Sequence, residues 1–115
     1  MAEIIVERAV SRNIPISSKK VEPVIALIRG DNVDLAMQKL KLINKKAAHY
    51  IYKTLQSAVA NAANNKRLDP KGMKVLKAWV TKGPKYKRYR AGGRGIAKPY
   101  IKHRANIFIE IGYGA

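Results

Sequence analysis

The sequence contains no cysteine and no long apolar run, and each absence excludes a class of protein. Without cysteine the chain can form no disulfide, no thiolate metal site and no thiol nucleophile. No apolar run approaches the length of a membrane span, and the first residues resemble neither a secretion signal nor an arginine- and serine-rich presequence. We therefore expect a soluble cytoplasmic protein with no membrane partner.

Acidic residues are scarce and unevenly distributed. The 115 residues include 24 lysines and arginines but only 7 aspartates and glutamates, which gives a net charge of +17. Between Lys71 and Ile109 there are twelve basic residues and no acidic one. Like charges at this density repel one another unless a polyanion neutralises them and releases its counterions. The sequence therefore predicts a nucleic-acid-binding protein rather than a merely solvated basic surface.

The sequence indicates neither a catalytic site nor a metal site. His49 and His103 lie far apart in the sequence, and neither has an acidic residue near it. No glycine-rich phosphate loop of the Walker type is present. Gly92, Gly93 and Gly95 lie between basic segments and open no helix, so a turn is the better interpretation. We expect a protein that is not an enzyme and needs no metal or cofactor.

The first seventy residues predict one strand and three helices. The β-branched residues within 2–10 indicate the strand. Ser17 and Ser18 can cap a first helix ending at Arg29–Gly30, in which Pro23 predicts a kink or a late start. A second helix follows Asn32, and a third runs from about 44 to about 64. The apolar stripes of the three helices are Val21, Val24, Ile25 and Ile28; Val33, Ala36, Met37 and Leu40; and Ala48, Ile51, Leu55, Ala58, Val59 and Ala62.

The last forty-five residues predict two more strands. Within 73–81, Val75, Trp79 and Thr81 alternate with Leu76, Ala78 and Val80, which indicates a strand buried on much of both faces, with Trp79 in the core. Within 105–113, three isoleucines alternate with Asn106, Phe108 and Glu110. The predicted fold class is α+β, with three helices packed on one face of a small antiparallel three-stranded sheet.

The segment between these two strands predicts a long basic β-hairpin that projects from a single domain. The globular part comprises 1–81 and 103–115, and the hairpin comprises 82–102 with its tip near 91–96. Each arm has about ten residues and reaches roughly 30 Å at about 3.3 Å per residue. Three tyrosines, Tyr86, Tyr89 and Tyr100, are interleaved with the cations. They can pack across the strands or stack on unpaired bases, and both interpretations stay open.

Several short stretches, each present once, follow one another in an order that matches a known family pattern. They are Ile16-Ser17-Ser18-Lys19-Lys20, Leu27-Ile28-Arg29-Gly30, Lys45-Lys46-Ala47-Ala48, Ser57-Ala58-Val59-Ala60-Asn61-Ala62, Gly83-Pro84 followed by Lys87-Arg88, and Asn106-Ile107. In this order and spacing the chain resembles, from about Ala9 to Ile111, the bacterial-type family of large-subunit ribosomal protein twenty-two. The resemblance implies a structural constituent of the large ribosomal subunit. It also implies a hairpin that runs through ribosomal RNA to line the nascent-peptide exit tunnel.

The resemblance also implies site residues and partners. The residues expected to bind RNA are Lys19, Lys20, Lys45, Lys46, Lys85, Lys87, Arg88, Arg90, Arg94, Lys98, Lys102 and Arg104. The expected hairpin tip consists of Ala91, Gly92, Gly93, Arg94, Gly95 and Ile96. The expected partners are large-subunit ribosomal RNA, neighbouring ribosomal proteins and the nascent peptide in the tunnel, with no homo-oligomer. The protein would support subunit assembly, in a cytoplasmic or alternatively a plastid ribosome.

This chain departs from the family pattern at the tip and in the first helix. Gly92 and Ile96 occupy places where the family usually has basic residues, Ala91 stands where proline is common, and Pro23 interrupts the first helix. We therefore expect fewer phosphate contacts at the tip. The alternative function is a free-standing basic RNA- or DNA-binding protein, such as an RNA chaperone or a compacting protein. A compacting protein usually dimerises, and the sequence offers no self-complementary apolar patch.

The composition of the hairpin yields a first prediction. Ile96 and Ile101 are nearly its only sizeable aliphatic side chains, and a two-stranded ribbon alone in water is marginally stable. We expect amide hydrogen exchange on the free protein to show little protection from Arg88 to Lys98, and more when RNA is bound. Strong protection of this segment without RNA would contradict the prediction.

Overall fold

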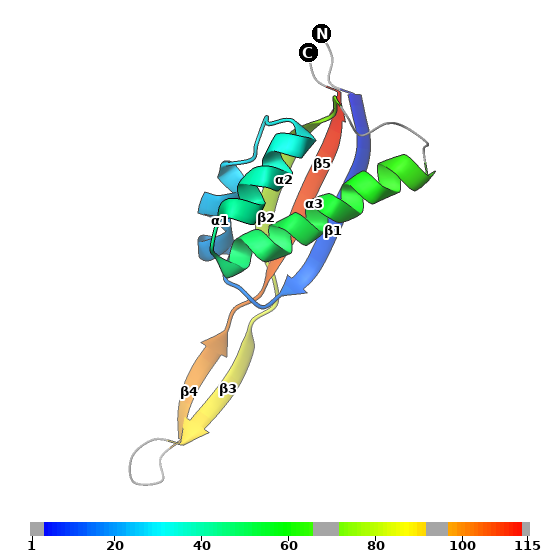
Figure 1. The fold of residues 1–115 in the computed structure, drawn as a ribbon. Coiled ribbons are helices and arrows are strands. Elements are labelled where there is room, and N and C mark those ends of the chain that lie inside the picture. Colours follow the sequence, from blue (N-terminus) through cyan, green and yellow to red (C-terminus); the bar gives the residue numbers. More distant parts are fainter. Residues whose placement is uncertain (1–3, 66–71, 92–96, 114–115) are drawn as a thin grey trace.

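The computed structural model describes residues 4–65, 72–91 and 97–113. In chain order the elements are β1 (Ile4–Ile14), α1 (Ser18–Ala26), α2 (Val33–Leu42), α3 (Lys46–Asn65), β2 (Lys74–Lys82), β3 (Tyr86–Ala91), β4 (Ala97–Lys102) and β5 (Ala105–Tyr113). Figure 1 shows the three helices on one face of a sheet and a two-stranded ribbon extending from one end. The predicted α+β class, with helices on a three-stranded antiparallel sheet, is confirmed.

The strands of the sheet are ordered β1-β5-β2, and both neighbours of the central strand β5 are antiparallel to it. Residues directly opposite one another on paired strands share a face of the sheet. Ala9, Ile109 and Ala78 form one such row, and all three are buried beneath the helices. The predicted alternation of β5 is confirmed, because Ile107, Ile109 and Ile111 are fully buried.

The prediction for the faces of β2 is wrong in part because this strand contains an irregularity. The register against β5 shifts between Val75 and Lys77, where a bulge adds a residue and reverses the alternation. Val75 therefore joins Ala78 in the core, whereas simple alternation groups it with Trp79 and Thr81. Thr81 is exposed and Trp79 is only half-buried, so Trp79 does not belong to the core.

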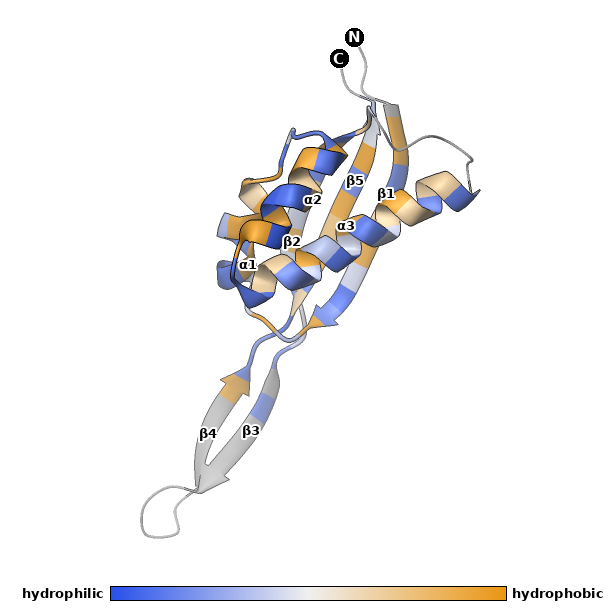
Figure 2. Cartoon of the chain, in the orientation of Figure 1, coloured by the Kyte–Doolittle hydropathy of each residue, from blue (hydrophilic) through white to orange (hydrophobic). Residues whose placement is uncertain are grey.

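Each helix buries most of the apolar stripe that its sequence predicts, and the remaining two residues, Met37 and Val59, are half-buried against the core. Figure 2 shows hydrophobic and hydrophilic residues on different sides of the helices. Four alanines of α3, Ala47, Ala48, Ala58 and Ala62, are buried, and such small side chains let the helix lie close to the sheet. No helix in the described part of the chain combines the length and the hydropathy needed to span a membrane.

The ends of α1 differ from the prediction. The helix begins at Ser18 despite Pro23, so a late start is wrong, and it ends at Ala26 rather than near Gly30. Ile28 still reaches the core from the following turn and is fully buried. Gly30 has a φ of +80°, a left-handed conformation that glycine adopts without strain, and its N–H donates to the Val75 carbonyl at 2.9 Å. The glycine therefore ties the turn after α1 to β2.

The ribbon is formed by β3 and β4, which pair antiparallel from Tyr86 opposite Lys102 to Ala91 opposite Ala97. The predicted turn residues Gly92 to Ile96 lie outside the described residues. The molecule measures 63 × 25 × 25 Å, and Figure 1 shows the ribbon along its long dimension. Because β2 leads into β3 and β4 leads into β5, the ribbon is an extension of the edge strand β2 and the central strand β5.

The packing of α3 on the sheet yields a stability prediction. Leu55 is fully buried in the core cluster, so Leu55→Ala should leave a cavity and lower the free energy of unfolding by about 2–5 kcal/mol. Leu42, the last residue of α2, is 85% exposed and provides a matched control. Leu42→Ala should change the free energy by no more than about 0.5 kcal/mol. Urea unfolding followed by circular dichroism measures both, and equal effects would contradict the assigned core.

Candidate nucleic-acid interface

The root of the ribbon is the place where the sheet strands become the ribbon strands. There the N–H of Gly83 donates to the carbonyl of Arg104 at 2.8 Å. A Cβ atom at position 83 would lie only 3.1 Å from the backbone carbon of Arg104. Glycine therefore permits a close approach of the two chain segments, and a larger side chain would press on Arg104. The root is narrow and fixed by a backbone hydrogen bond.

A groove lies beside this root. The link between β1 and α1, one side of α1, the start of α3, the end of β4 and the two residues after it line a volume of about 880 Å³. Ile16 and Ala47 are buried side chains that anchor the link and the start of α3 in the core. The N–H of Ile16 also donates to the carbonyl of Ile14 at 2.8 Å, which fixes the turn. The residues that line the groove are Pro15, Ile16, Ser17, Lys20, Pro23, Lys45, Lys46, Ala47, Lys102, His103 and Arg104.

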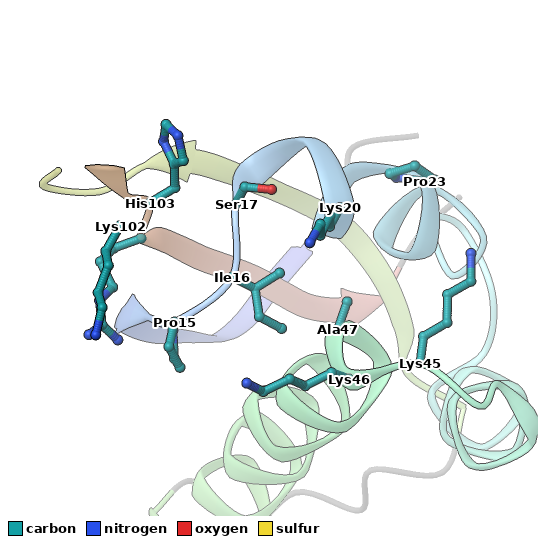
Figure 3. Close-up of a pocket in the computed structure, with 11 residues that line it drawn as sticks. Pro15, Ile16, Ser17, Lys20, Pro23, Lys45, Lys46, Ala47, Lys102 and His103 are labelled. Atoms are coloured by element: carbon teal, nitrogen blue, oxygen red, sulfur yellow. The ribbon is translucent and has the colours of Figure 1, made fainter. Parts of the chain in front are cut away.

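The groove is strongly basic because cations from distant parts of the sequence meet there. Lys20 comes from α1, Lys45 and Lys46 from the start of α3, and Lys102 and Arg104 from the root of the ribbon. Figure 3 shows the labelled lysines arranged around a centre that contains Ile16 and Ala47. The described lining residues include no aspartate or glutamate. The surface is therefore an apolar floor with a cationic rim, which suits a ligand that carries phosphates and flat apolar rings.

A second, smaller hollow of about 300 Å³ shares Ser17, His103 and Arg104 with the groove. Its other lining residues are Ser18, Lys19, Lys82, Gly83 and Lys85. The described lining again includes no acidic residue. The two hollows therefore form one basic surface that touches both chain segments of the ribbon root, and we call this surface the root groove.

Three carboxylates elsewhere in the described part of the chain form ion pairs that do not involve the lining of the root groove. Lys39 binds Asp31 at 2.7 Å, Arg29 binds Glu22 at 2.8 Å, and Arg8 binds Glu110 at 3.2 Å. Each of these acids neutralises a cation near it, whereas the lining of the root groove contains only basic charge. The uneven charge of the sequence is thus concentrated at one place in space, which raises the local electrostatic potential.

The structure brings together only some of the residues predicted to bind RNA. Seven of them line the root groove, namely Lys19, Lys20, Lys45, Lys46, Lys85, Lys102 and Arg104. Lys87 is exposed on β3, beyond the groove. Arg88, Arg90 and Lys98 occupy ribbon positions whose side chains are not described, and Arg94 and the tip residues Gly92, Gly93, Gly95 and Ile96 lie outside the described residues. Ala91 ends β3.

Sequence reasoning missed several residues. Lys82 and His103 line the root groove, and their position next to the hairpin was a usable signal. It also missed two half-buried aromatic residues, Trp79 and Phe108, on the sheet face away from the helices. The alternation of Arg8, Val10 and Arg12 along β1 could have revealed that face. No group of three histidine, aspartate or glutamate side chains within 4–65, 72–91 and 97–113 could hold a metal ion.

A small α+β domain with a basic ribbon and a basic groove at its root defines a class of protein built to contact a polyanion. Comparison with known families identifies the family within this class to which the chain belongs. The family described as Ribosomal protein L22p/L17e matches residues 9–112, nearly the whole chain. The chain belongs to this family, and it is therefore a protein of the large ribosomal subunit. Membership implies association with ribosomal RNA and ribosomal proteins, in a family that is typically structural rather than enzymatic.

Proposed function

We propose that the chain holds large-subunit ribosomal RNA at the root groove and along the ribbon, and thereby supports assembly of the subunit. The observation that carries the proposal is the root groove, in which four separate segments of the sequence contribute cations and no described lining residue is acidic. Lysines there meet phosphates as point charges, and Arg104 can form bidentate contacts. The protein acts by binding and positioning, without catalysis.

The ribbon extends the same role. Its register sets Arg90 directly opposite Lys98, and Lys102 opposite Tyr86. Like charges at directly opposite positions destabilise an antiparallel pair, and a phosphate backbone beside them removes the penalty. We propose that the ribbon runs into the ribosomal RNA and that its tip, at 91–96, lines the exit tunnel and meets the nascent peptide. The support for the tunnel contact is family membership together with the projecting ribbon.

Fractionation tests this function directly. A lysate separated on a sucrose gradient at high salt should retain the protein with the large subunit, because an embedded ribbon dissociates more slowly than a surface contact. Immunoblotting of the fractions provides the measurement, with a peripheral ribosomal protein as the control that the wash removes. Recovery at the top of the gradient, together with RNA or DNA binding in vitro, would favour a free-standing nucleic-acid-binding protein instead.

Single substitutions test the binding residues. Lys46→Ala in the root groove and Lys87→Ala, Arg88→Ala or Arg90→Ala in the ribbon should each weaken RNA binding. Each should also flatten the dependence of log K on log salt by about 0.7–0.9 for every phosphate that the variant no longer neutralises. Fluorescence anisotropy with a labelled fragment of ribosomal RNA, repeated over a range of salt concentrations, measures both effects.

Lys53→Ala is the matched control, since Lys53 is an exposed lysine of α3 outside the lining of the root groove. It removes the same charge and should leave the salt slope nearly unchanged. A slope that is the same for Lys46→Ala and Lys53→Ala would remove the root groove from the binding surface. Unchanged slopes in the three ribbon variants would remove the ribbon.

A further inference from the structure

The sheet has a second face, which the helices do not cover. Register places Val10, Phe108 and Trp79 directly opposite one another across the three strands, and the next such row along the strands is Arg8, Glu110 and Lys77. These two rows alternate with the buried row that contains Ile109, so they point away from the helices. We call them the outer face. The interactions that join the fold to RNA in the proposed function do not use it.

The centre of the outer face is a stacked aromatic pair. The ring centroids of Trp79 and Phe108 are 5.1 Å apart and their planes differ by 2°. The guanidinium of Arg8 lies 5.6 Å from the centre of the Trp79 ring, and that of Arg12 lies 5.8 Å from the centre of the Phe108 ring. Both rings are half-buried, and neighbouring Val10 is 38% exposed. The face therefore combines parallel aromatic rings, planar cations and open apolar surface.

We propose that the outer face is a second RNA-binding surface, on which unpaired bases pack against the exposed edges of the Trp79–Phe108 pair and stack on the guanidinium of Arg12, while Arg12 and Lys77 contact the adjoining phosphates. This inference rests on the proposed function in one respect, that the partner is RNA. Every base presents a π-face to an aromatic ring, and guanidinium planes stack on bases as well. Cross-strand packing alone accounts for the ring pair, but it requires neither the exposed cations nor the exposed Val10.

Charge favours RNA over a protein partner. Glu110, the carboxylate beside the rings, is only 4% exposed and is bound to Arg8 at 3.2 Å, so it adds little negative charge to the surface. Arg12 and Lys77 are exposed cations on either side of the ring pair. An apolar protein surface would desolvate these cations without compensation, whereas a phosphate backbone pairs with them.

The outer face is also continuous with the root groove. Thr81, which is exposed and opposite Asn106, follows Trp79 along β2, and the next two residues, Lys82 and Gly83, line the smaller hollow. An RNA segment that leaves the groove along the edge of β2 thus reaches the ring pair without crossing a helix. The same polyanion can occupy both surfaces.

Trp79 is the only tryptophan of the chain, so its fluorescence reports on this face alone. The probes are a single-stranded RNA oligonucleotide, a duplex RNA of the same length and inorganic polyphosphate, each added to the full chain at low salt. The single strand should quench Trp79 emission and protect it from acrylamide. Duplex RNA and polyphosphate should bind, as followed by anisotropy or by competition with labelled RNA, and should leave Trp79 emission and accessibility unchanged, because they offer no unpaired base.

Variants separate stacking from charge. Phe108→Leu keeps an apolar side chain and the Trp79 reporter, and it should weaken single-strand binding by about 5-fold or more, because it removes a ring and the surface on which the Arg12 guanidinium lies. Arg12→Gln is an exposed substitution that does not disturb the core, and it should flatten the salt slope by about 0.7. Lys53→Gln removes the same charge elsewhere and is the control. Lys46→Gln should weaken the binding of single-stranded RNA but leave the quenching of Trp79 emission at saturating RNA unchanged.

The outcomes distinguish this inference from the proposed function. If single-stranded RNA binds by anisotropy while Trp79 emission and acrylamide accessibility stay unchanged, the outer face does not bind RNA and is left for a neighbouring protein. If Arg12→Gln behaves as Lys53→Gln does, the phosphate contact is likewise overturned. If the chain binds none of the probes in anisotropy, both the proposed function and this inference fail together.

Discussion

The antiparallel pairing of β2 with β5 is the constraint on which the rest of the structure depends. Val75 and Ile111 are opposite one another and fully buried, so the helices hold this pair of strands in a fixed register. The same strands leave the sheet at Lys82 and Ala105, and the hydrogen bond from Gly83 to Arg104 closes the root of the ribbon. The direction and register of the ribbon therefore follow from the packing of the core, although the ribbon has no core of its own. A change that loosened β2 would move the basic surface as well.

The distribution of charge separates the two parts of the molecule. Around the helices and on the sheet, acids such as Asp31 and Glu110 pair with nearby cations, so part of the positive charge there is neutralised, although Arg12 and Lys77 stay exposed. At the root groove the described lining is basic only, and repulsion among its cations opposes folding. Bound RNA would make the same cations stabilise the folded state, because it supplies phosphates to them and releases counterions to the solvent. The free energy of unfolding of the chain is thereby coupled to its partner, as it is for any protein whose ligand binds only the folded state.

Periodicity predicts the elements well and the spatial groupings poorly, for a physical reason. The stripes of the three helices and the isoleucines of β5 repeat at the period of their element, and burial of those residues follows from local geometry. The predicted face of Val75 is wrong because one bulge reverses every later residue, and alternation alone does not reveal a bulge. The four lysines of the globular part were found through family resemblance. These lysines lie near Lys102 and Arg104 only in the folded protein, because β1, α1 and α3 pack together at the end of β5. The groove cannot be inferred from any single contiguous stretch of the sequence, because its lining residues come from distant segments.

The root groove and the outer face use different chemistry, and the strand β5 joins them. The groove has five cations around an apolar floor in its larger part, which suits phosphates first. The outer face has a stacked ring pair with cations beside it, which suits bases first. Arg104, just before β5, and Phe108, within β5, are four residues apart, which is about 13 Å along an extended chain. This span is short enough for one segment of unpaired RNA to contact both, with its backbone in the groove and its bases against the sheet. A duplex can place its backbone in the groove but cannot place its bases against the sheet, because its bases are already stacked on one another. The protein thus presents RNA with a surface that distinguishes an unpaired segment from a helix by shape and stacking, without reading base edges.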